Sequence, residues 1–558
     1  MSREIYFVLV VLFTICHNRF SEANFTLKII HFNDLHARYD EITNSSTPCI
    51  AGESQNCMAG IARLATTVSK LRKESNNHLV LNAGDVFQGT IWYNLMKWNV
   101  SQFFMKNIAA DAMTLGNHEF DDGIKGLLPF LEALKGVTPV AVSNLQIPKT
   151  NIKELKDLNS LVQQEPLKVT VDGHVIGIIG VIYDETNKIA DTDPVTFKNS
   201  VDSVRQQAKL LKEDGVDKVI VLSHCGILED KRIAEQAGDD IDIIVGGHSH
   251  TLLYSGIPPH NQAAFDTYPI VVNLKNNHKV LIVQAFCHGM FVGNLDVTFD
   301  SKGEIVAHKG VPVYQDSGIE KDDTFDKYVQ DFKKDIDEKS SAKIGETELV
   351  LDHEKCREQE CKMGSALADA YLWYYKDDPQ PPRLAMIHPG NFRTTLSPKV
   401  ITRGQVLTAM PFRAGGNRVT ISGSVIKQAL EYGATLSKRC RYNVVQVAGI
   451  KVSIDFAKEK GSRASIEVNI DGGYKSLELS KNYTIIVNAY MLKGGDGFDM
   501  FQNTISEKWG PTDSEMFEKY ISESKGIKVK SFEQPRIRIE NNNNAVKELD
   551  RCKVSRRK

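Results

Sequence analysis

The sequence has almost no excess of charge of either sign. Its 558 residues include 68 lysines and arginines against 70 aspartates and glutamates, which gives a formal net charge of -2. A chain with this balance offers no general electrostatic field for nucleic acid or for an anionic membrane, so any anionic ligand must be bound locally. Also absent are an internal repeat at solenoid spacing and an Arg-Gly-Asp adhesion tripeptide. The charge balance predicts no nucleic-acid partner, and no obligate protein partner is evident from the sequence.

Long hydrophobic runs are missing too, because only the N-terminus has one and it is short. Arg3 precedes an apolar stretch from Ile5 to Cys16, and Ser21-Glu22-Ala23 follows. This order is typical of a secretory signal peptide over residues 1–23, whereas a membrane anchor needs about 20 apolar residues. The C-terminal tail is polar and basic and lacks the run that a lipid-anchor signal requires. We therefore expect a secreted, extracellular protein without a membrane anchor.

Cysteine usage agrees with an oxidising compartment. Removal of Cys16 with the signal peptide leaves eight of the nine cysteines, an even number. Close spacing predicts two local disulfides, Cys49–Cys57 and Cys356–Cys361. Spacing does not pair the other four, which are Cys225, Cys287, Cys440 and Cys552. Four N-x-[ST] sequons predict a glycoprotein, at Asn24, Asn44, Asn99 and Asn482.

The length predicts at least two domains, since 558 residues exceed what one core supports. Strand-like and helix-like segments alternate over residues 24–315, as βαβ units do, with helices expected at 59–73, 123–134 and 201–214. The segment 319–339 is charged and amphipathic, which predicts a linker helix over 316–340. A second mixed α/β stretch covers 341–540. The asparagine run at 541–544 predicts a disordered polar tail over 541–558.

Five short apolar runs in the first half of the chain each end at side chains that bind metals. The runs span 27–30, 79–81, 112–115, 219–222 and 241–245, and their boundaries predict buried strands. Side chains just past such strands gather at one edge of an open α/β sheet. The predicted metal ligands are Asp34, His36, Asp85, Asn117, His224, His248 and His250.

Seven ligands are too many for one ion, so we expect two divalent cations bridged by the Asp85 carboxylate. The imidazoles favour zinc, with manganese or cobalt as alternatives, over calcium. Two such cations lower the pKa of a shared water and clamp phosphoryl oxygens for in-line displacement. His118 is interpreted as a general acid or a stabiliser of transition-state charge, with its ring oriented by Asp121. The pattern predicts a two-metal phosphoesterase.

Longer motifs resemble the 5′-nucleotidase family of calcineurin-like metallophosphoesterases, which includes secreted salivary apyrases of blood-feeding arthropods. The resemblance covers about 27–540 and is carried by the stretches 33–38, 83–92, 115–121 and 494–498. It implies an α/β fold. A metallophosphoesterase α/β/β/α sandwich at 24–315 would be followed by a bridging helix and a nucleotide-binding C-terminal domain at 341–540.

The resemblance also implies roles for individual residues. One cation would take Asp34, His36, Asp85 and His250, and the other would take Asp85, Asn117, His224 and His248. Nucleotide contacts would come from Arg38, Arg357, Arg393, Phe412, Tyr490 and Asp496. One departure stands out, since the family's Asn-Gly-Gly-Gly-Ile-Arg stretch is here His388-Pro-Gly-Asn-Phe-Arg393. His388 replaces the asparagine that meets the base, which leaves base contacts and substrate preference open.

We expect an apyrase that hydrolyses extracellular ATP and ADP to AMP and phosphate by in-line attack of a metal-bound hydroxide. In the saliva of a blood-feeding arthropod, such an enzyme would inhibit platelet aggregation. The alternative is a 5′-nucleotidase that converts AMP to adenosine. A remote alternative is a non-catalytic binder of nucleotides or receptors, which is disfavoured because every ligand is retained.

Overall fold

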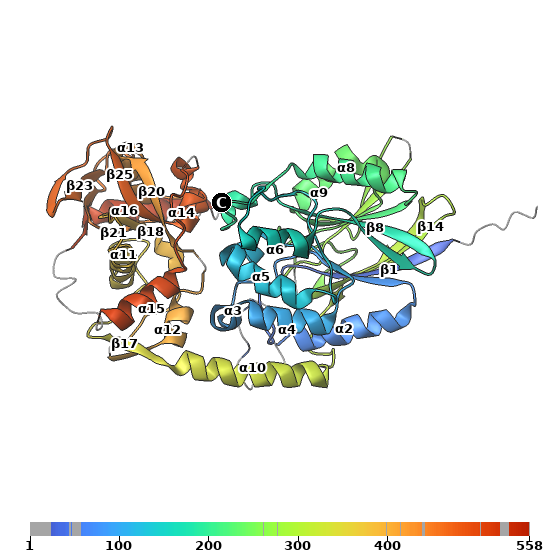
Figure 1. Ribbon diagram of the computed structural model, residues 1–558. Coiled ribbons are helices and arrows are strands. Elements are labelled where there is room, and N and C mark those ends of the chain that lie inside the picture. The colour runs from blue at the N-terminus through green and yellow to red at the C-terminus, as the bar shows by residue number, and fades with distance from the viewer. Residues whose placement is uncertain are drawn as a thin grey trace, which may run out of the picture. The chain divides into compact units, whose positions relative to one another are not determined.

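A computed structural model describes residues 24–43, 46, 49, 57–259, 262–275, 277–397, 399–412, 414–437, 441–502, 504–524 and 535–556 (Figure 1). The predicted signal peptide, the sequon at Asn44 and Cys440 lie outside these residues. The chain forms two compact units. Unit 1 comprises the residues up to Phe87 and Trp98–Val329, and unit 2 comprises Gln88–Lys97 and the residues from Gln330 onward. The division falls inside helix α10 (Asp323–Ser341), at the position of the predicted linker helix.

Unit 1 contains two large sheets. The first has the strand order β15-β14-β1-β2-β3-β4-β6, with β16 paired to β14. Its middle strands run parallel from β1 to β6, while β14 and β15 are antiparallel additions at one side. The strands are β1 (Phe25–Phe32), β2 (His78–Asn82), β3 (Ala112–Met113), β4 (Val140–Ala141), β6 (Val162–Gln163), β14 (Phe291–Phe299), β15 (Ile305–Gly310) and β16 (Val313–Tyr314).

The second sheet has the order β12-β13-β11-β10-β8-β7, with a parallel centre from β8 to β13. Its strands are β7 (Leu167–Val171), β8 (His174–Ile182), β10 (Lys218–His224), β11 (Ile243–Val245), β12 (Ile270–Asn273) and β13 (Lys279–Val283). Central strands such as β10 are buried along their whole length. Strands buried on both faces read as continuous apolar runs, which is the pattern the sequence shows.

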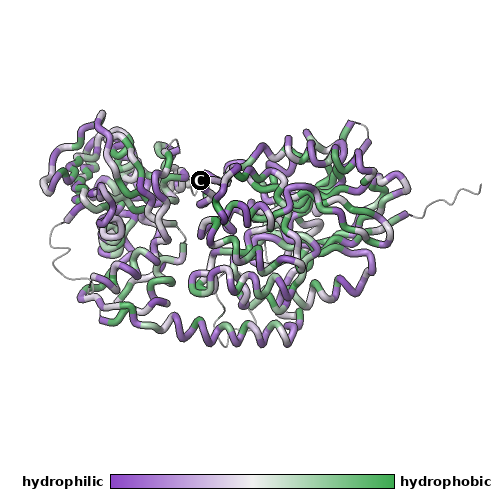
Figure 2. The backbone as a smooth tube through the Cα atoms, in the orientation of Figure 1, coloured by the Kyte–Doolittle hydropathy of each residue, from purple (hydrophilic) through white to green (hydrophobic). Residues whose placement is uncertain are grey.

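The two sheets of unit 1 pack face to face. One hydrophobic core joins residues of β1 and β2 to residues of β8, β10 and β13. Figure 2 shows hydrophobic residues concentrated in the interior of unit 1. Helix α2 (Ile61–Glu74) contacts β1 and β14 of the first sheet, while α8 (Ser200–Glu213) and α9 (Ile227–Ala237) contact β8 and β13 of the second (Figure 1). Helices α4 (Trp98–Ile108) and α5 (Gly123–Leu134) lie on the same side as α2 (Figure 1). This arrangement confirms the predicted α/β/β/α sandwich.

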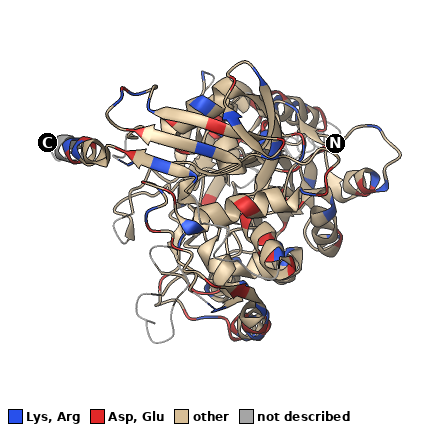
Figure 3. Cartoon of the chain, turned by 90° about the vertical axis from the view of Figure 1, so that its left-hand side faces the viewer, with Lys and Arg blue, Asp and Glu red and all other residues tan. Residues whose placement is uncertain are grey.

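Unit 2 is a mixed α/β structure, as the sequence predicted. Its larger sheets have the orders β20-β25-β18-β21 and β24-β23-β22-β26, and β17 pairs with β19. The strands are β17 (Lys343–Thr347), β18 (Ala385–Ile387), β19 (Lys399–Thr402), β20 (Gly416–Ser422), β21 (Gln446–Ala448), β22 (Ile450–Asp455), β23 (Ala464–Ile470), β24 (Gly473–Ser476), β25 (Asn482–Asn488) and β26 (Ile537–Glu540). The helices include α11 (Lys362–Tyr374), α12 (Arg403–Ala409), α13 (Gly423–Gly433) and α15 (Asp513–Glu523). Basic and acidic residues are interspersed along strands and helices alike (Figure 3).

The predicted disulfides Cys49–Cys57 and Cys356–Cys361 are both present. Cys552 is also disulfide-bonded, whereas Cys225 and Cys287 are free and buried. The sequon residues Asn24, Asn99 and Asn482 are exposed, and their glycosylation stays a prediction. Among the described helices, none combines the length and the apolar character needed to cross a bilayer.

The prediction of a disordered tail was wrong for most of its length. Residues Asn542–Arg556 form helix α16. Glu548 in this helix pairs with the Arg463 guanidinium and accepts a hydrogen bond of 3.1 Å from the Tyr442 hydroxyl, and Ala545 is buried. These contacts come from residues about 100 positions earlier. Tertiary packing therefore stabilises a helix that the local composition does not predict.

Candidate metal centre and nucleotide site

The ends of five strands bring the predicted metal ligands together. Asp34 and His36 follow β1, Asp85 follows β2, and Asn117 begins the short helix η2 (Asn117–Phe120) after β3. From the second sheet, His224 is the last residue of β10, and His248 and His250 follow β11. The first two loops continue the strand pairing, since Asp34 N donates to Gly84 O at 2.9 Å and His36 N donates to Asp85 O at 3.0 Å.

The structure groups six of these side chains into two sets of potential ligand atoms. In one set, His250 Nε2 lies 3.2 Å from Asp34 Oδ1 and 2.9 Å from His36 Nε2. In the other set, His224 Nε2 lies 3.1 Å from Asp85 Oδ2, with His248 alongside. Asp85 Oδ2 also lies 3.9 Å from His36 Nε2, which puts this carboxylate between the two sets. Each set combines residues from both sheets.

The donor atoms in this cluster fit divalent cations. Asp34 Oδ1, Asn117 Oδ1 and His224 Nε2 are buried and have no hydrogen-bond partner within the described part of the chain. Buried polar atoms are rarely left unpaired, and each such atom calls for an explanation such as an ion. Carboxylate oxygens, one amide oxygen and imidazole nitrogens together suit zinc, manganese or cobalt.

The electrostatics of the cluster also favour positive charge. Despite burial, Asp85 raises the pKa of His224 to about 9, and Asp34 raises the pKa of His250 to about 10. Burial lowers the pKa of His248 to about 4 and holds that of His36 well below its usual range, so these two imidazoles are neutral at pH 7. Neutral imidazole is the form that binds metals.

The backbone of the cluster is strained in a way that points to function. Asp34, His36, Asp85, His248 and His250 all have φ between 50° and 73°, in the left-handed region. Residues other than glycine rarely adopt this conformation, and such outliers cluster at active sites. The loops also approach so closely that a Cβ at Gly116 would collide with Asp85 Oδ1. Ligand positions in this cluster therefore depend on an unusual backbone.

Glu119 holds the loops that carry Asp85 and Asn117. Its buried carboxylate accepts hydrogen bonds from four backbone N–H groups, those of Asp85, Val86, Phe87 and Gly116, at 2.6–3.0 Å. Burial and the charge of Asp85 raise the pKa of Glu119 to about 7, although the backbone donors oppose this shift. Sequence reasoning missed Glu119. Its position within the motif 115–121, among residues predicted to bind metal or transfer protons, was the signal that could have identified it.

Other groups orient the ligands. His224 Nδ1 hydrogen-bonds Ala83 O at 2.6 Å, which directs Nε2 toward Asp85. Asn33 Nδ2 donates to Asp34 Oδ2 at 2.7 Å and to Phe286 O at 2.6 Å. Such partners fix the tautomer and the direction of metal-binding side chains. His118 Nδ1 lies 2.7 Å from Asp121 Oδ2, which fixes the direction of a ring that is 27% exposed.

Unit 2 gathers positive charge around Asp496. The Asp496 carboxylate lies 3.3 Å from Arg357 Nη1 and 3.2 Å from Arg441 Nη2, and it accepts a hydrogen bond of 3.3 Å from the Tyr490 hydroxyl. Arg357 also bonds the Asn443 side chain. Sequence reasoning missed Arg441, whose Nε is buried without a partner among the described residues. No sequence motif marks Arg441, because it reaches Asp496 through folding alone.

The two predicted aromatic residues are unusually exposed. Phe412 and Tyr490 are 40% and 41% exposed, and the Arg393 guanidinium lies 4.3 Å from the centre of the Phe412 ring. His388 is buried and packs edge-on against Tyr490, with ring centres 5.0 Å apart. Burial and the nearby Arg357 lower the pKa of His388 to about 3, so its ring is neutral. In unit 1, Arg38 is mostly buried and donates from Nη1 to His36 O at 2.9 Å.

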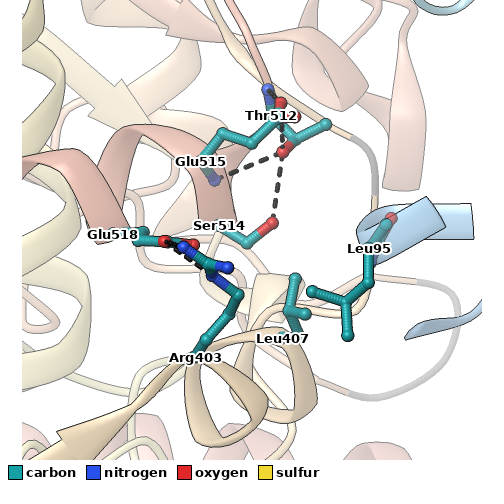
Figure 4. Close-up of a pocket in the computed structure, with 8 residues that line it drawn as sticks. Leu95, Arg403, Leu407, Thr512, Ser514, Glu515 and Glu518 are labelled. Carbon is teal, nitrogen blue, oxygen red and sulfur yellow. Dashed lines mark hydrogen bonds and ion pairs between the residues drawn. The ribbon is translucent and has the colours of Figure 1, made fainter. Parts of the chain in front are cut away.

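Unit 2 also has a pocket with a cavity volume of about 170 Å³ beside α12 and α15 (Figure 4). Its polar walls are already paired, since Arg403 binds Glu518 at 2.5–2.7 Å and Thr512 caps α15 with Glu515. Leu95, from helix α3 (Ile91–Met96), and Leu407 supply apolar lining. The pocket contains none of the predicted site residues.

Comparisons with known proteins agree with this architecture. The family model for calcineurin-like phosphoesterase matches residues 27–252, and that for the 5'-nucleotidase C-terminal domain matches residues 343–503. A protein named apyrase from Anopheles gambiae is 39% identical over 94% of this chain and 92% of its own length. A protein named apyrase from Aedes aegypti is 40% identical over 90% of each chain. The solved 5'-nucleotidase precursor of Thermus thermophilus is 30% identical, with a TM-score of 0.62 over 93% of this chain and all of the other.

The resemblance seen in the motifs is therefore confirmed over nearly the whole chain. The two family models follow each other in the order in which the metal cluster and the Asp496 cluster occur. The chain belongs to the 5′-nucleotidase family of metal-dependent nucleotide phosphohydrolases.

Proposed function

We propose that this protein is a secreted apyrase that hydrolyses ATP and ADP to AMP and phosphate. The reaction would use two divalent cations, for which zinc is the first choice. The observation that carries the proposal is the group of buried atoms Asp34 Oδ1, Asn117 Oδ1 and His224 Nε2, which accept or donate no hydrogen bond among the described residues and lie within two sets of potential ligands. Relatives named apyrase at 39–40% identity support the choice of substrate.

The two cations would be held as the family resemblance implies. Asp34, His36, Asp85 and His250 would bind one, and Asp85, Asn117, His224 and His248 would bind the other. When bound, such a pair activates a water and neutralises phosphoryl charge. His118, kept in place by Asp121, would donate a proton to the leaving phosphate or stabilise the charge that develops there.

Recognition of the nucleotide would fall to unit 2 and to Arg38. Arg357, Arg393 and Arg441 would offer planar guanidinium donors to anionic oxygens. Phe412 and Tyr490 have the exposure that stacking on a base requires, and each stacked ring contributes about 1–3 kcal/mol. Asp496 would bind ribose hydroxyl groups through its carboxylate.

Secretion would place this activity where extracellular nucleotides act. The apolar N-terminal run, the two short-range disulfides and the three exposed sequon asparagines support an extracellular setting. Removal of ATP and ADP would suppress platelet aggregation, because these nucleotides act as signals there. Removal of residues 1–23 as a signal peptide can be tested by sequencing the N-terminus of the protein recovered from culture medium.

The test of function is phosphate release from ATP, ADP and AMP, measured side by side with added divalent metal and then with chelator. We expect release from ATP and ADP that stops at AMP and is lost with chelator. Release chiefly from AMP would instead establish a 5′-nucleotidase. No phosphate release from any of the three nucleotides would favour a non-catalytic binder. Asp85→Ala should be inactive, whereas Asp202→Ala, at a side chain that is 73% exposed on α8, should match the wild type.

A further inference from the structure

Another group of metal-binding side chains lies beside the phosphoesterase centre. His250, Cys287 and His288 each offer one ligand atom, and these atoms all lie within 4.8 Å of one another. Neither Cys287 nor His288 is among the seven residues proposed for the metal centre. Both lie in the turn between β13 and β14, at the edge of the second sheet where His250 follows β11.

This turn is held in a fixed position against the metal centre. His288 N donates to Asp34 O at 2.7 Å, and Met290 N donates to Cys287 O at 3.1 Å. The His288 ring uses Nδ1 for a hydrogen bond of 2.9 Å with Ser46 Oγ, which leaves Nε2 for a ligand. Phe286 and His288 have φ of 59° and 60°, so the turn has the strained backbone found at functional sites.

The chemistry of the group differs from that of the main centre. Cys287 is a free thiol that is 4% exposed. The proposed phosphoesterase ligands contain no sulfur. One thiolate with two imidazoles selects zinc and similar thiolate-seeking cations over magnesium, calcium or manganese.

We propose that His250, Cys287 and His288 form a separate zinc site that shares His250 with the phosphoesterase centre. Binding replaces the Cys287 S–H bond with an S–Zn bond and releases the proton to solvent. Because His250 Nε2 lies 3.2 Å from Asp34 Oδ1, a zinc ion that draws this imidazole toward Cys287 weakens one side of the main centre. Excess zinc therefore inhibits the enzyme. The binding part of this inference is independent of the proposed function, and the inhibition part rests on it.

Cadmium reports on the site directly, because a cadmium–thiolate bond adds a charge-transfer band in the ultraviolet. The mature protein, supplied with manganese, should gain this band with one equivalent of cadmium and lose it when zinc competes. Cys287→Ser should abolish the band. His288→Asn, which tolerates the left-handed backbone, should weaken cadmium binding by at least about tenfold. Cys225→Ser removes the other free, buried thiol and should leave the band intact.

Phosphate release from ATP supplies the second measurement. With manganese supplied and neither cadmium nor zinc added, Cys287→Ser should match the wild type, and its sensitivity to both added cations should fall by at least about tenfold. Inhibition that is equal in wild type and Cys287→Ser would overturn the shared-ligand proposal, because cadmium would then act at the main centre alone. A band that survives in Cys287→Ser would overturn the site itself. If no nucleotide is hydrolysed, the absorption titration still tests whether the zinc site exists. If Cys287→Ser fails to fold, the cadmium affinity of His288→Asn tests the site instead.

Discussion

Replacing Glu119 with glutamine tests whether the loops of the metal centre are held as the structure indicates. Glu119 Oε2 accepts from the backbone N–H groups of Asp85 and Gly116, and Oε1 accepts from those of Val86 and Phe87. Glutamine has nearly the same shape but replaces one oxygen with an NH₂ group, which cannot accept. Two buried backbone donors therefore lose their acceptor in Glu119→Gln.

The number of donors left without an acceptor sets the expected loss of unfolding free energy. Each unsatisfied buried group costs about 1–3 kcal/mol, so two cost about 2–6 kcal/mol of unfolding free energy. Most native domains have a total of about 5–15 kcal/mol, so the change is large enough to measure. Because these loops carry Asp85 and Asn117, affinity for divalent metal should also fall by about 10- to 100-fold.

Urea unfolding with excess metal and with chelator measures the first effect, and metal titration measures the second. Glu132→Gln is the matched control, since the Glu132 side chain is 65% exposed. It should change neither quantity. If Glu119→Gln unfolds within about 0.5 kcal/mol of the wild type and binds metal equally well, the hydrogen bonds to Glu119 do not hold the site and the reasoning fails.

Four further predictions address the two clusters and the core of unit 2. Asp85→Ala should lower turnover by about 100-fold or more and reduce bound metal, and metal content near that of the wild type would contradict a bridging role. Tyr490→Ala should raise KM for ATP by about 5- to 150-fold with little change in kcat, and an unchanged KM would exclude stacking. Arg441→Ala should raise KM for ATP by about tenfold, with partial rescue in Arg441→Lys, and equal KM values in all three proteins would remove Arg441 from the phosphate site. Burial raises the pKa of Asp513 to about 8, so the folded state keeps a proton that the unfolded chain releases near pH 4. The contribution of this proton to the unfolding free energy is full below about pH 4 and is lost as pH rises to about 8. Asp513→Asn should therefore flatten the fall in unfolding free energy between pH 5 and pH 8, and parallel pH profiles would refute the shift.

Local patterns predicted the elements that position the metal centre. The helix expected at 123–134 has these bounds in the structure, and the helices expected at 59–73 and 201–214 are shifted by one or two residues. Strand prediction worked because buried parallel strands are continuous apolar runs bounded by Gly, Asn and Asp. The run 241–245 became a strand only from Ile243, and Ile241 at its start is the C-cap of the short helix η3 (Gly238–Asp240).

What the sequence did not predict depends on contacts between distant segments. The tail helix α16 forms against Arg463 and Tyr442, and Arg441 meets Asp496 from 55 positions away. Gln88–Lys97 follows a metal motif in sequence but belongs to unit 2 by its contacts. The roles of individual metal ligands remain predictions that the substitutions above test.

Each set of metal ligands draws side chains from both sheets of the sandwich. Asp34 and His36 extend from the first sheet toward His250 of the second, and Asp85 does the same toward His224. Bound cations would therefore act as cross-links that tie two independently hydrogen-bonded sheets at one edge. Any ligand that binds only the folded state adds RT ln(1 + [L]/Kd), about 2.7 kcal/mol at a concentration 100 times Kd. The melting temperature of unit 1 then becomes a gauge of free divalent metal in the surrounding solution.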